Sequence, residues 1–252
     1  MLSQEEKIYG TDYTPEQVVD QALTNKVQGI SFTYTEPTIF YEFAYDTSKI
    51  ARQKGLYNCF VTNGYTSPEA IKKISKYLDA AVVDFKGSGN AKFYREFSQV
   101  PQVKPIFDAL LAYKKNKVFL EVTNLLIPKI GDNMADIKKL CSWIVDNLGP
   151  EIPFHFISFF PSYELDLPPT PVETLEKAHE IAKKAGLQYV YLGNVFGHKY
   201  ESTYCPSCGA LVIQRIGIDV TRFLLGKDCK CLKCGKKILL GGQRWVSASL
   251  WQ

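Results

Sequence analysis

Short apolar runs alternate with longer segments of helical periodicity over the first 195 residues. The runs are rich in β-branched and aromatic residues, as strands are, and they fall at 29–34, 57–62, 80–86, 118–126, 153–159 and 189–192. Strands separated by helices indicate βαβ units and a parallel sheet. Six such units favour a partial or complete barrel over a flat sheet. The predicted fold class is therefore α/β, with a barrel whose completeness the pattern leaves open.

Capping signals mark several helix starts. Thr14 and Thr170 each precede a proline, and a glutamine or glutamate stands three positions further on, as in a capping box. The helices between these two are expected at 37–54, from 67 onward, and at 92–97, 103–115 and 134–148. The chain thus opens on a helix instead of a strand, and we expect the first strand of the barrel to be missing.

The pattern changes between Gly197 and Tyr204, after which short β segments and turns follow. We therefore predict a partial barrel over 1–197 and a small zinc-ribbon-like domain over 198–252. The second domain carries two C-x-x-C pairs, each followed by a glycine that permits a tight turn: Cys205, Cys208, Cys231 and Cys234. Four thiolates at this spacing predict one structural Zn²⁺. Cys229 stands too close to Cys231 to form a C-x-x-C pair with it, and its participation is left open.

Composition narrows the class of protein. The chain has 252 residues, 46% of them apolar, and a formal charge of +4, which is too small to indicate a nucleic-acid partner. Seven cysteines, five of them between 205 and 234, suit a metal site better than a disulfide framework. No run is long enough to span a membrane and no signal peptide is evident. We expect a cytoplasmic protein without a membrane partner.

Polar residues follow three successive predicted strands. Glu36 follows the first, Thr62 and Asn63 end the second, and Asp84 and Lys86 end the third. The carboxyl ends of parallel strands carry the ligand site in such folds, so we place the candidate chemistry there. Each group has a plainer alternative. Asp84 and Lys86 could form a simple salt bridge, Glu36 could stabilise a helix start, and Asn63 could belong to a turn.

The remaining reactive side chains carry weaker signals. His155 lies on a predicted strand and has two possible locations. It faces either the interior of the barrel, where ligands bind, or the packed core between the strands and helices. His179 lies on a predicted helix and is expected to be exposed. Cys59 and Cys141 are expected to be small apolar core residues.

The segments FTYTEPTIFYEFAYDT, FVTNGY, VVDFKG, YVYLGNV, CPSCG and CLKCG make the chain resemble the radical S-adenosylmethionine (SAM) superfamily. The resemblance is to the enzymes of the AmmeMemoRadiSam system, which are related to pyruvate formate-lyase activating enzymes. It implies a partial (β/α)6 TIM-like barrel as the fold. It also implies SAM and a [4Fe-4S] cluster as cofactors and a 5′-deoxyadenosyl radical as the reactive species. It also implies SAM contacts by these residues: Glu36, Thr62, Asn63, Asp84, Lys86 and His155.

One motif of that family is absent from the 252 residues. The family holds its cluster with C-x-x-x-C-x-x-C after the first strand, and no such spacing occurs here. We expect the chain to lack the N-terminal segment that carries the motif, so whether it is itself an enzyme stays open. Two alternatives remain: a barrel lyase using Lys86 as Schiff-base nucleophile, or a binding module working through its ribbon. The expected partner is a protein or small-molecule substrate, with other proteins of the same system as candidates; nucleic acid is not expected.

Overall fold

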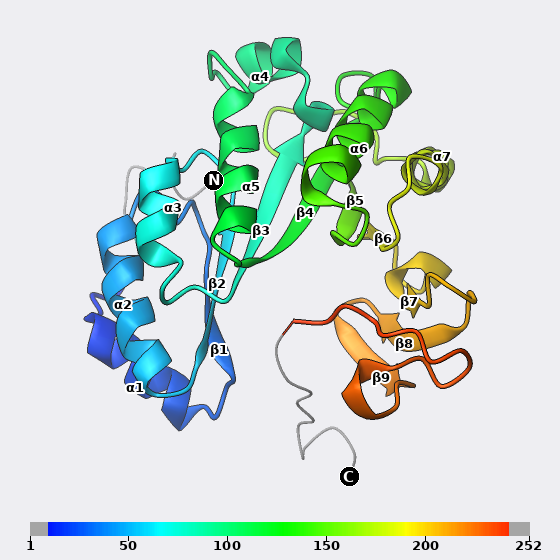
Figure 1. The fold of residues 1–252 in the computed structure, drawn as a ribbon. Helices are drawn as coiled ribbons and strands as arrows, with labels where there is room; N and C mark the ends of the chain where they lie inside the picture. Colours follow the sequence, from blue (N-terminus) through cyan, green and yellow to red (C-terminus); the bar gives the residue numbers. More distant parts are fainter. Residues whose placement is uncertain (1–9, 242–252) are drawn as a thin grey trace.

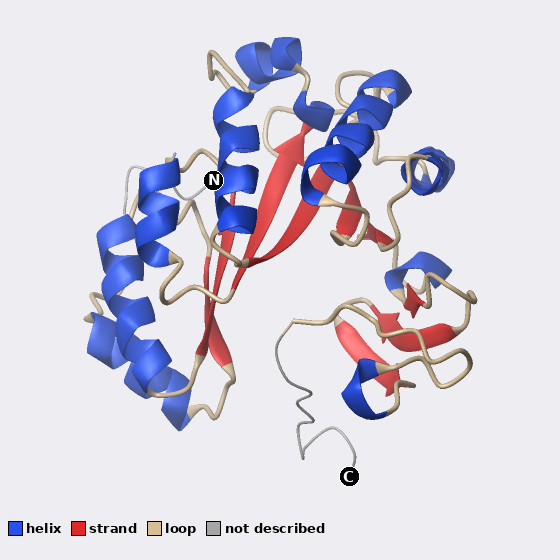
Figure 2. Ribbon diagram, viewed as in Figure 1, coloured by secondary structure: helices blue, strands red, loops and turns tan. Residues whose placement is uncertain are grey.

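The computed structural model describes residues 10–241, and a six-stranded parallel sheet forms its centre (Figures 1 and 2). The strands lie in chain order, as predicted from the alternating pattern. They are β1 (Gly29–Phe32), β2 (Tyr57–Thr62), β3 (Ala80–Lys86), β4 (Phe119–Leu126), β5 (Phe154–Ser158) and β6 (Val190–Gly193). This arrangement is consistent with a partial barrel.

Seven α-helices are found among the described residues, and Figure 1 shows them along the outer side of the sheet. They are α1 (Pro15–Thr24), α2 (Tyr41–Gln53), α3 (Pro68–Ile74), α4 (Ala91–Phe97), α5 (Lys104–Lys115), α6 (Met134–Leu148) and α7 (Val172–Lys184). Three short 3-10 helices accompany them: η2 (Gly87–Gly89), η3 (Lys199–Glu201) and η4 (Lys227–Cys229). In residues 10–241, no helix is both long and apolar enough to cross a membrane.

A second, three-stranded antiparallel sheet follows η3. It consists of β7 (Thr203–Tyr204), β8 (Leu211–Ile216) and β9 (Asp219–Phe223), and it lies apart from helices α1–α6 in Figure 1. We call the part from β7 to Gly241 the ribbon. The predicted domain boundary at 197/198 falls between β6 and η3 and stays a prediction.

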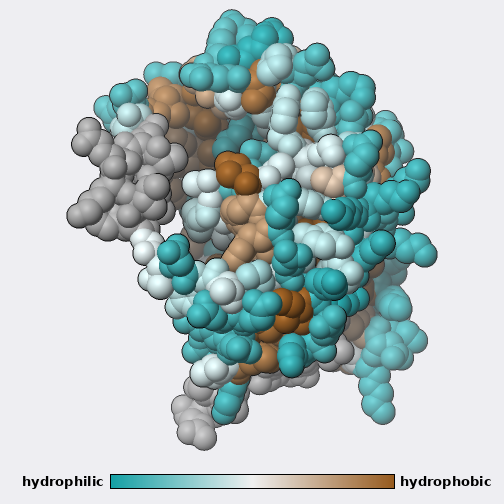
Figure 3. Space-filling model, turned by 90° about the vertical axis from the view of Figure 1, so that its left-hand side faces the viewer, coloured by the Kyte–Doolittle hydropathy of each residue, from teal (hydrophilic) through white to brown (hydrophobic). Residues whose placement is uncertain are grey.

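The two faces of the central sheet differ in composition because side chains alternate along a strand. On the helix side, Phe60, Val83, Val122 and Phe156 are fully buried. They pack with apolar side chains of α5 and α6 in one continuous core. The opposite face carries the partly exposed positions of the same strands. The outer surface over α1–α3 is mainly hydrophilic, with small separate apolar patches (Figure 3).

Of the two predicted helix caps, the structure confirms Thr14 and contradicts Thr170. The Gln17 amide donates to Thr14 Oγ1 at 3.3 Å, and the Thr14 amide donates to Gln17 Oε1 at 2.8 Å, a complete capping box. Thr170 does not cap α7. Its hydroxyl donates to the Leu126 carbonyl at 2.6 Å and accepts from the Phe159 amide at 2.8 Å. Thr170 is buried, and its hydroxyl therefore joins the ends of β4 and β5 instead.

The helix predicted from residue 37 begins four residues later, at Tyr41. The Glu36 carboxylate accepts hydrogen bonds from both the amide and the hydroxyl of Thr38. The Ile39 amide in turn donates to the Glu36 carbonyl at 3.0 Å. These bonds hold 36–39 as a turn, so the helical pattern starts only after it.

His179 was expected to be exposed and is instead 7% exposed. Its ring stacks on Tyr200 with centroids 3.7 Å apart, and within the described residues its Nδ1 has no hydrogen-bond partner. Burial, assisted by the nearby charge of Lys183, lowers the pKa of His179 from 6.5 to about 4.

This buried imidazole predicts an acid-sensitive fold. As the pH falls below 6.5, His179 becomes protonated in the unfolded chain. In the folded chain it stays neutral until the pH reaches about 4. The free energy of unfolding should therefore fall as the pH drops through this window. Urea unfolding at a series of pH values should show a shallower fall for His179→Phe, which keeps the stacked ring but cannot titrate. Equal pH dependence of the two proteins would contradict the assignment.

Candidate functional site

Glu36 ties the end of β1 to the end of β2. The side chain is 8% exposed. Its Oε1 accepts from the Thr62 hydroxyl at 2.7 Å and from Thr38, and its Oε2 accepts from the Asn63 amide at 2.7 Å. The carboxylate is thus held in one orientation at the carboxyl edge of the sheet by groups from two elements.

Asp84 and Lys86 form an ion pair at the end of β3. The Thr123 hydroxyl, from β4, donates to the other Asp84 oxygen at 2.7 Å. The salt-bridge alternative is therefore present, and both residues share one face of the strand as predicted. The ion pair is partly exposed to solvent, since the side chains of Asp84 and Lys86 are 33% and 39% exposed. Both charged groups remain accessible to a ligand.

Strand register places these groups at one edge of the sheet, with the Thr62 side chain on the helix side and the Asp84 and Lys86 side chains on the opposite face. Thr62 pairs with Val83, so the next residues along the two strands, Asn63 and Asp84, continue at the same edge. We call Glu36, Thr62, Asn63, Asp84 and Lys86 the strand-end site. Asn63 also makes the turn that its sequence allowed, because its Oδ1 accepts from the Tyr65 amide at 2.8 Å.

His155 lies apart from the strand-end site. It is on β5, its Nε2 lies 2.8 Å from Glu121 Oε2 on β4, and its ring stacks on Tyr191 with centroids 4.8 Å apart. Of its two predicted locations, the structure gives the inner face of the sheet, away from the helix-side core. The SAM contact assigned to His155 by resemblance stays a prediction.

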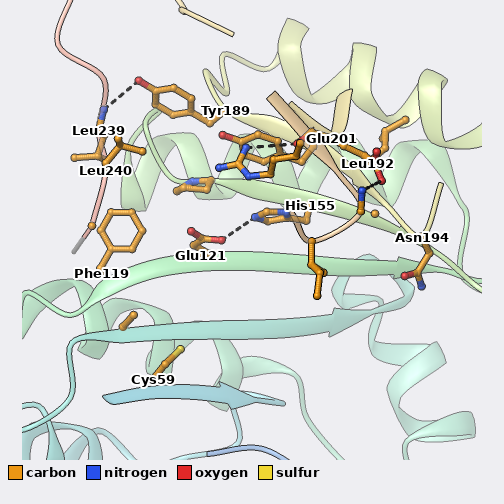
Figure 4. A pocket seen from close by; sticks show the side chains of 18 of the residues that line it. Cys59, Phe119, Glu121, His155, Tyr189, Leu192, Asn194, Glu201, Leu239 and Leu240 are labelled. Atoms are coloured by element: carbon orange, nitrogen blue, oxygen red, sulfur yellow. Dashed lines mark hydrogen bonds and ion pairs between the residues drawn. The ribbon is translucent and has the colours of Figure 1, made fainter. Parts of the chain in front are cut away.

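The inner face of the sheet borders a cavity of about 1190 Å³. Its walls come from the first residues of β2, β3 and β4, from His155 of β5, from β6 and the residues that follow it, and from the ribbon, including its segment 239–241. Figure 4 shows Phe119, Glu121 and Cys59 projecting from the sheet toward the space that Tyr189 and Leu239 border. None of the strand-end site lines this cavity, whereas His155 does.

Cys59 was expected in the core, but it lines the cavity because it occupies an inward-facing position of β2. Burial, with the negative charge of Glu121 adding to it, raises the pKa of the Cys59 thiol to about 11. The thiol is therefore neutral at pH 7. Cys141, by contrast, is fully buried on α6, as predicted.

Sequence reasoning overlooked the polar wall of this cavity. Glu121 lies between Phe119 and Thr123 at alternate positions of β4, and it is the charged residue on the inward face of that strand. That alternation was the available signal. Tyr191 and Arg215 gave none, since their roles depend on the docking of the ribbon onto β6.

The ribbon is joined to the sheet through Thr203. Its hydroxyl oxygen lies 3.0 Å from the Tyr191 hydroxyl and accepts from Arg215 Nη1 at 2.7 Å. The Arg215 guanidinium lies over the Tyr191 ring, 5.6 Å from its centroid. His155, Tyr191 and Arg215 thus form a stacked series that runs from the sheet into the ribbon.

The four ribbon cysteines form a candidate metal centre. One ligand atom from each of Cys205, Cys208, Cys231 and Cys234 lies within 4.8 Å of the others. Gly209 and Gly235 adopt the left-handed conformation, with φ of 70° and 75°, and each donates its amide to the first cysteine of its pair. The two turns are therefore alike, and Cys229 is not part of the group. The Lys236 amide and neighbouring thiols lower the pKa of Cys234 to about 7, which favours the thiolate that binds metal.

The thiols outside this group do not fit a [4Fe-4S] cluster. Cys59 is on β2, Cys141 on α6 and Cys229 in η4. Over residues 10–241, the ribbon group is the only set of three or more potential metal ligands found together. A cluster that binds SAM needs three protein thiolates and one open iron, and these residues do not provide that arrangement.

Comparisons with known proteins agree with this fold. Residues 3–144, more than half of the chain, match the Radical SAM superfamily. The chain is 45% identical over 229 residues to protein MJ0808 of Methanocaldococcus jannaschii, covering 90% of this chain and 67% of that protein. It is 20% identical over 153 residues to the (2S)-3-sulfopropanediol dehydratase activating enzyme of Klebsiella oxytoca, covering 58% of this chain and 47% of that enzyme.

A domain of a pyruvate-formate lyase-activating enzyme from Bacteroides vulgatus has a similar fold, with a TM-score of 0.56 and 18% identity. The match covers 66% of this chain and 99% of that domain. The protein described here therefore belongs to the radical SAM superfamily. The chain spans about two thirds of the length of MJ0808 and about half of the Klebsiella enzyme.

Proposed function

We propose that this chain binds SAM at the strand-end site. It would form the SAM-binding part of a radical SAM enzyme of the activating type, within the AmmeMemoRadiSam group. The observation that carries the proposal is the convergence of Glu36, Thr62, Asn63, Asp84 and Lys86 on one edge of the sheet, in a member of this superfamily. A partial barrel, a Zn²⁺ in the ribbon and partner proteins of the same system belong to the same proposal.

The charges of the site suit the amino-acid end of SAM. Glu36 Oε2 accepts a single hydrogen bond from the described residues, so it keeps a lone pair for the SAM ammonium. Lys86 is a cation at the same edge and suits the SAM carboxylate, with Asp84 as its partner until the ligand arrives. The brace by Thr62 and the Asn63 amide keeps the Glu36 carboxylate in place in either state.

The cluster that cleaves SAM reductively must be held by other residues. The thiols of the described chain do not fit it, so we propose that its ligands lie outside these 252 residues, in a segment preceding Met1 as the family resemblance indicates. The residues present would then bind and orient SAM while that segment supplies the metal chemistry.

Replacing Lys86 tests the proposal. Lys86→Met should weaken SAM binding about tenfold, since one charge-assisted contact is lost. The free energy of unfolding should change little, because a half-exposed ion pair contributes only about 0.2–1 kcal/mol. Isothermal titration with SAM and urea unfolding measure the two quantities.

Lys92→Met is the matched control, since Lys92 is an exposed lysine on α4 with a weak ion pair to Glu96 at 3.8 Å. It should leave SAM binding unchanged. A marked loss of stability in Lys86→Met with unchanged SAM affinity would show that the Asp84–Lys86 pair is purely structural.

A further inference from the structure

The cavity beneath the ribbon has the features of a second ligand site. Its volume of about 1190 Å³ is somewhat larger than that of most ligand pockets, which span roughly 300–1,000 Å³. Its lining combines aromatic walls with one polar pair, Glu121 and His155. It shares no residue with the strand-end site, and the single implied SAM contact that lines it is His155.

The polar pair offers two acceptors and no donor. A carboxylate only accepts hydrogen bonds, so His155 Nε2 must donate to Glu121 Oε2. In the neutral imidazole, Nδ1 is then an acceptor. Neither Glu121 Oε1 nor His155 Nδ1 has a hydrogen-bond partner within residues 10–241, and neither is a buried atom. Glu121 Oε1 and His155 Nδ1 are thus free to accept hydrogen bonds from a ligand in the cavity.

Glu121 is also the carboxylate of the lining whose charge is least compensated. Asp79 is paired with Arg52, and Glu201 accepts the amides of Gly197 and Gly217 at 2.9 and 3.2 Å. Within residues 10–241, the Glu121 carboxylate has a hydrogen bond only with the His155 imidazole. The site therefore presents a net negative position, although the whole chain carries a formal charge of +4.

Aromatic rings surround this position. Tyr57, Phe119, Tyr189 and Tyr191 all line the cavity. The faces of aromatic rings attract organic cations, and a carboxylate beside such rings is a common way to bind ammonium groups. Arg215 adds a positive charge, but its guanidinium is engaged by Thr203, the Glu201 carbonyl and the Tyr191 ring on the ribbon side.

We propose that this cavity binds a small organic amine, with its ammonium group donating to Glu121 Oε1 and His155 Nδ1 and its carbon chain against the aromatic wall. The site uses none of the residues of the strand-end site. The ribbon closes it from one side, through Arg215, Gly217 and the segment 239–241.

Cadaverine, 1,5-pentanediol and glutarate form a probe series of equal carbon-chain length and different charge. Each would be titrated into the metal-loaded chain while the methyl resonances of Leu192, Leu239 and Leu240, which line the cavity, are followed by NMR. Cadaverine should give saturable shifts at millimolar concentration. The diol should bind at least about tenfold more weakly, and glutarate should not bind.

Glu121→Gln removes the charge and keeps the shape, and it should weaken cadaverine binding by about tenfold. Glu180→Gln, at an exposed site on α7, is the matched control and should have no effect. Phe119→Leu, which removes one aromatic face, should also weaken binding. Thermal melting confirms that each variant is folded.

Three results would overturn the assignment: glutarate binding as well as cadaverine, no saturable shift with cadaverine, or equal affinities of wild type and Glu121→Gln. Lys86→Met separates this site from the proposed SAM site. It should leave cadaverine binding intact, so a failure of either proposal is visible without the other.

Discussion

Cys231→Ser should unfold the ribbon while the parallel sheet stays folded. Structural zinc contributes an apparent ~10–16 kcal/mol in small metal-bound domains, and the ribbon has little else to replace it. Its buried apolar side chains are few, chiefly Val212, Ile213 and Ile238. Without metal, these cannot offset the conformational entropy of about forty residues.

Hydrogen exchange by mass spectrometry should therefore show lost protection from β7 to Gly241 and retained protection in β2 to β5. Metal analysis should give one zinc per wild-type chain and well under one for the variant. Cys229→Ser is the matched control, because Cys229 lies outside the four-thiol group. A variant that keeps its ribbon protected, or a wild type purified without zinc, would refute the metal centre.

The second large effect concerns the chemistry itself. The 252-residue chain, reconstituted anaerobically with iron and sulfide and then given dithionite and SAM, should form no more than trace 5′-deoxyadenosine. Cys205, Cys208, Cys231 and Cys234 would hold any captured cluster with four protein ligands, closed to SAM. The other three cysteines lie on separate elements.

A chain extended before Met1 by a C-x-x-x-C-x-x-C segment from an activating enzyme should gain the activity. It should lose that activity again when the three added cysteines are changed to serine. Substantial 5′-deoxyadenosine from the unextended chain would show that its own thiols suffice and would end the proposal of external cluster ligands.

The parts of this fold that depend on local pattern were predictable. Short apolar runs rich in β-branched and aromatic residues located all six strands, and the paired C-x-x-C turns identified the four-thiol group. The strand-end site followed from the rule that parallel strands end at one edge. The brace of Glu36 by Thr62 and Asn63 was not foreseen, and neither were the Thr38 bonds to Glu36 that hold a turn ahead of α2.

Features that depend on contacts distant in sequence were missed. The local sequence around Thr170 predicts a helix cap, but its hydroxyl donates a hydrogen bond to the Leu126 carbonyl, 44 positions earlier. His179 reads as a surface residue until Tyr200 covers it. The cavity needs Glu121 from β4 and Arg215 from β8, which only the docking of the ribbon brings to one space.

The alternation of β4 has a consequence for how such a protein changes over time. Leu120, Val122 and Leu126 face the helices and form the core, whereas Phe119 and Glu121 face the cavity. A substitution on the cavity side alters what can bind but removes little buried packing, so it costs little folding free energy. Ligand preference can therefore diverge between relatives, or be redesigned in the laboratory, while the scaffold remains intact. The cavity-facing residues of β4 can therefore vary with the ligand, while its helix-facing residues stay the same and maintain the fold.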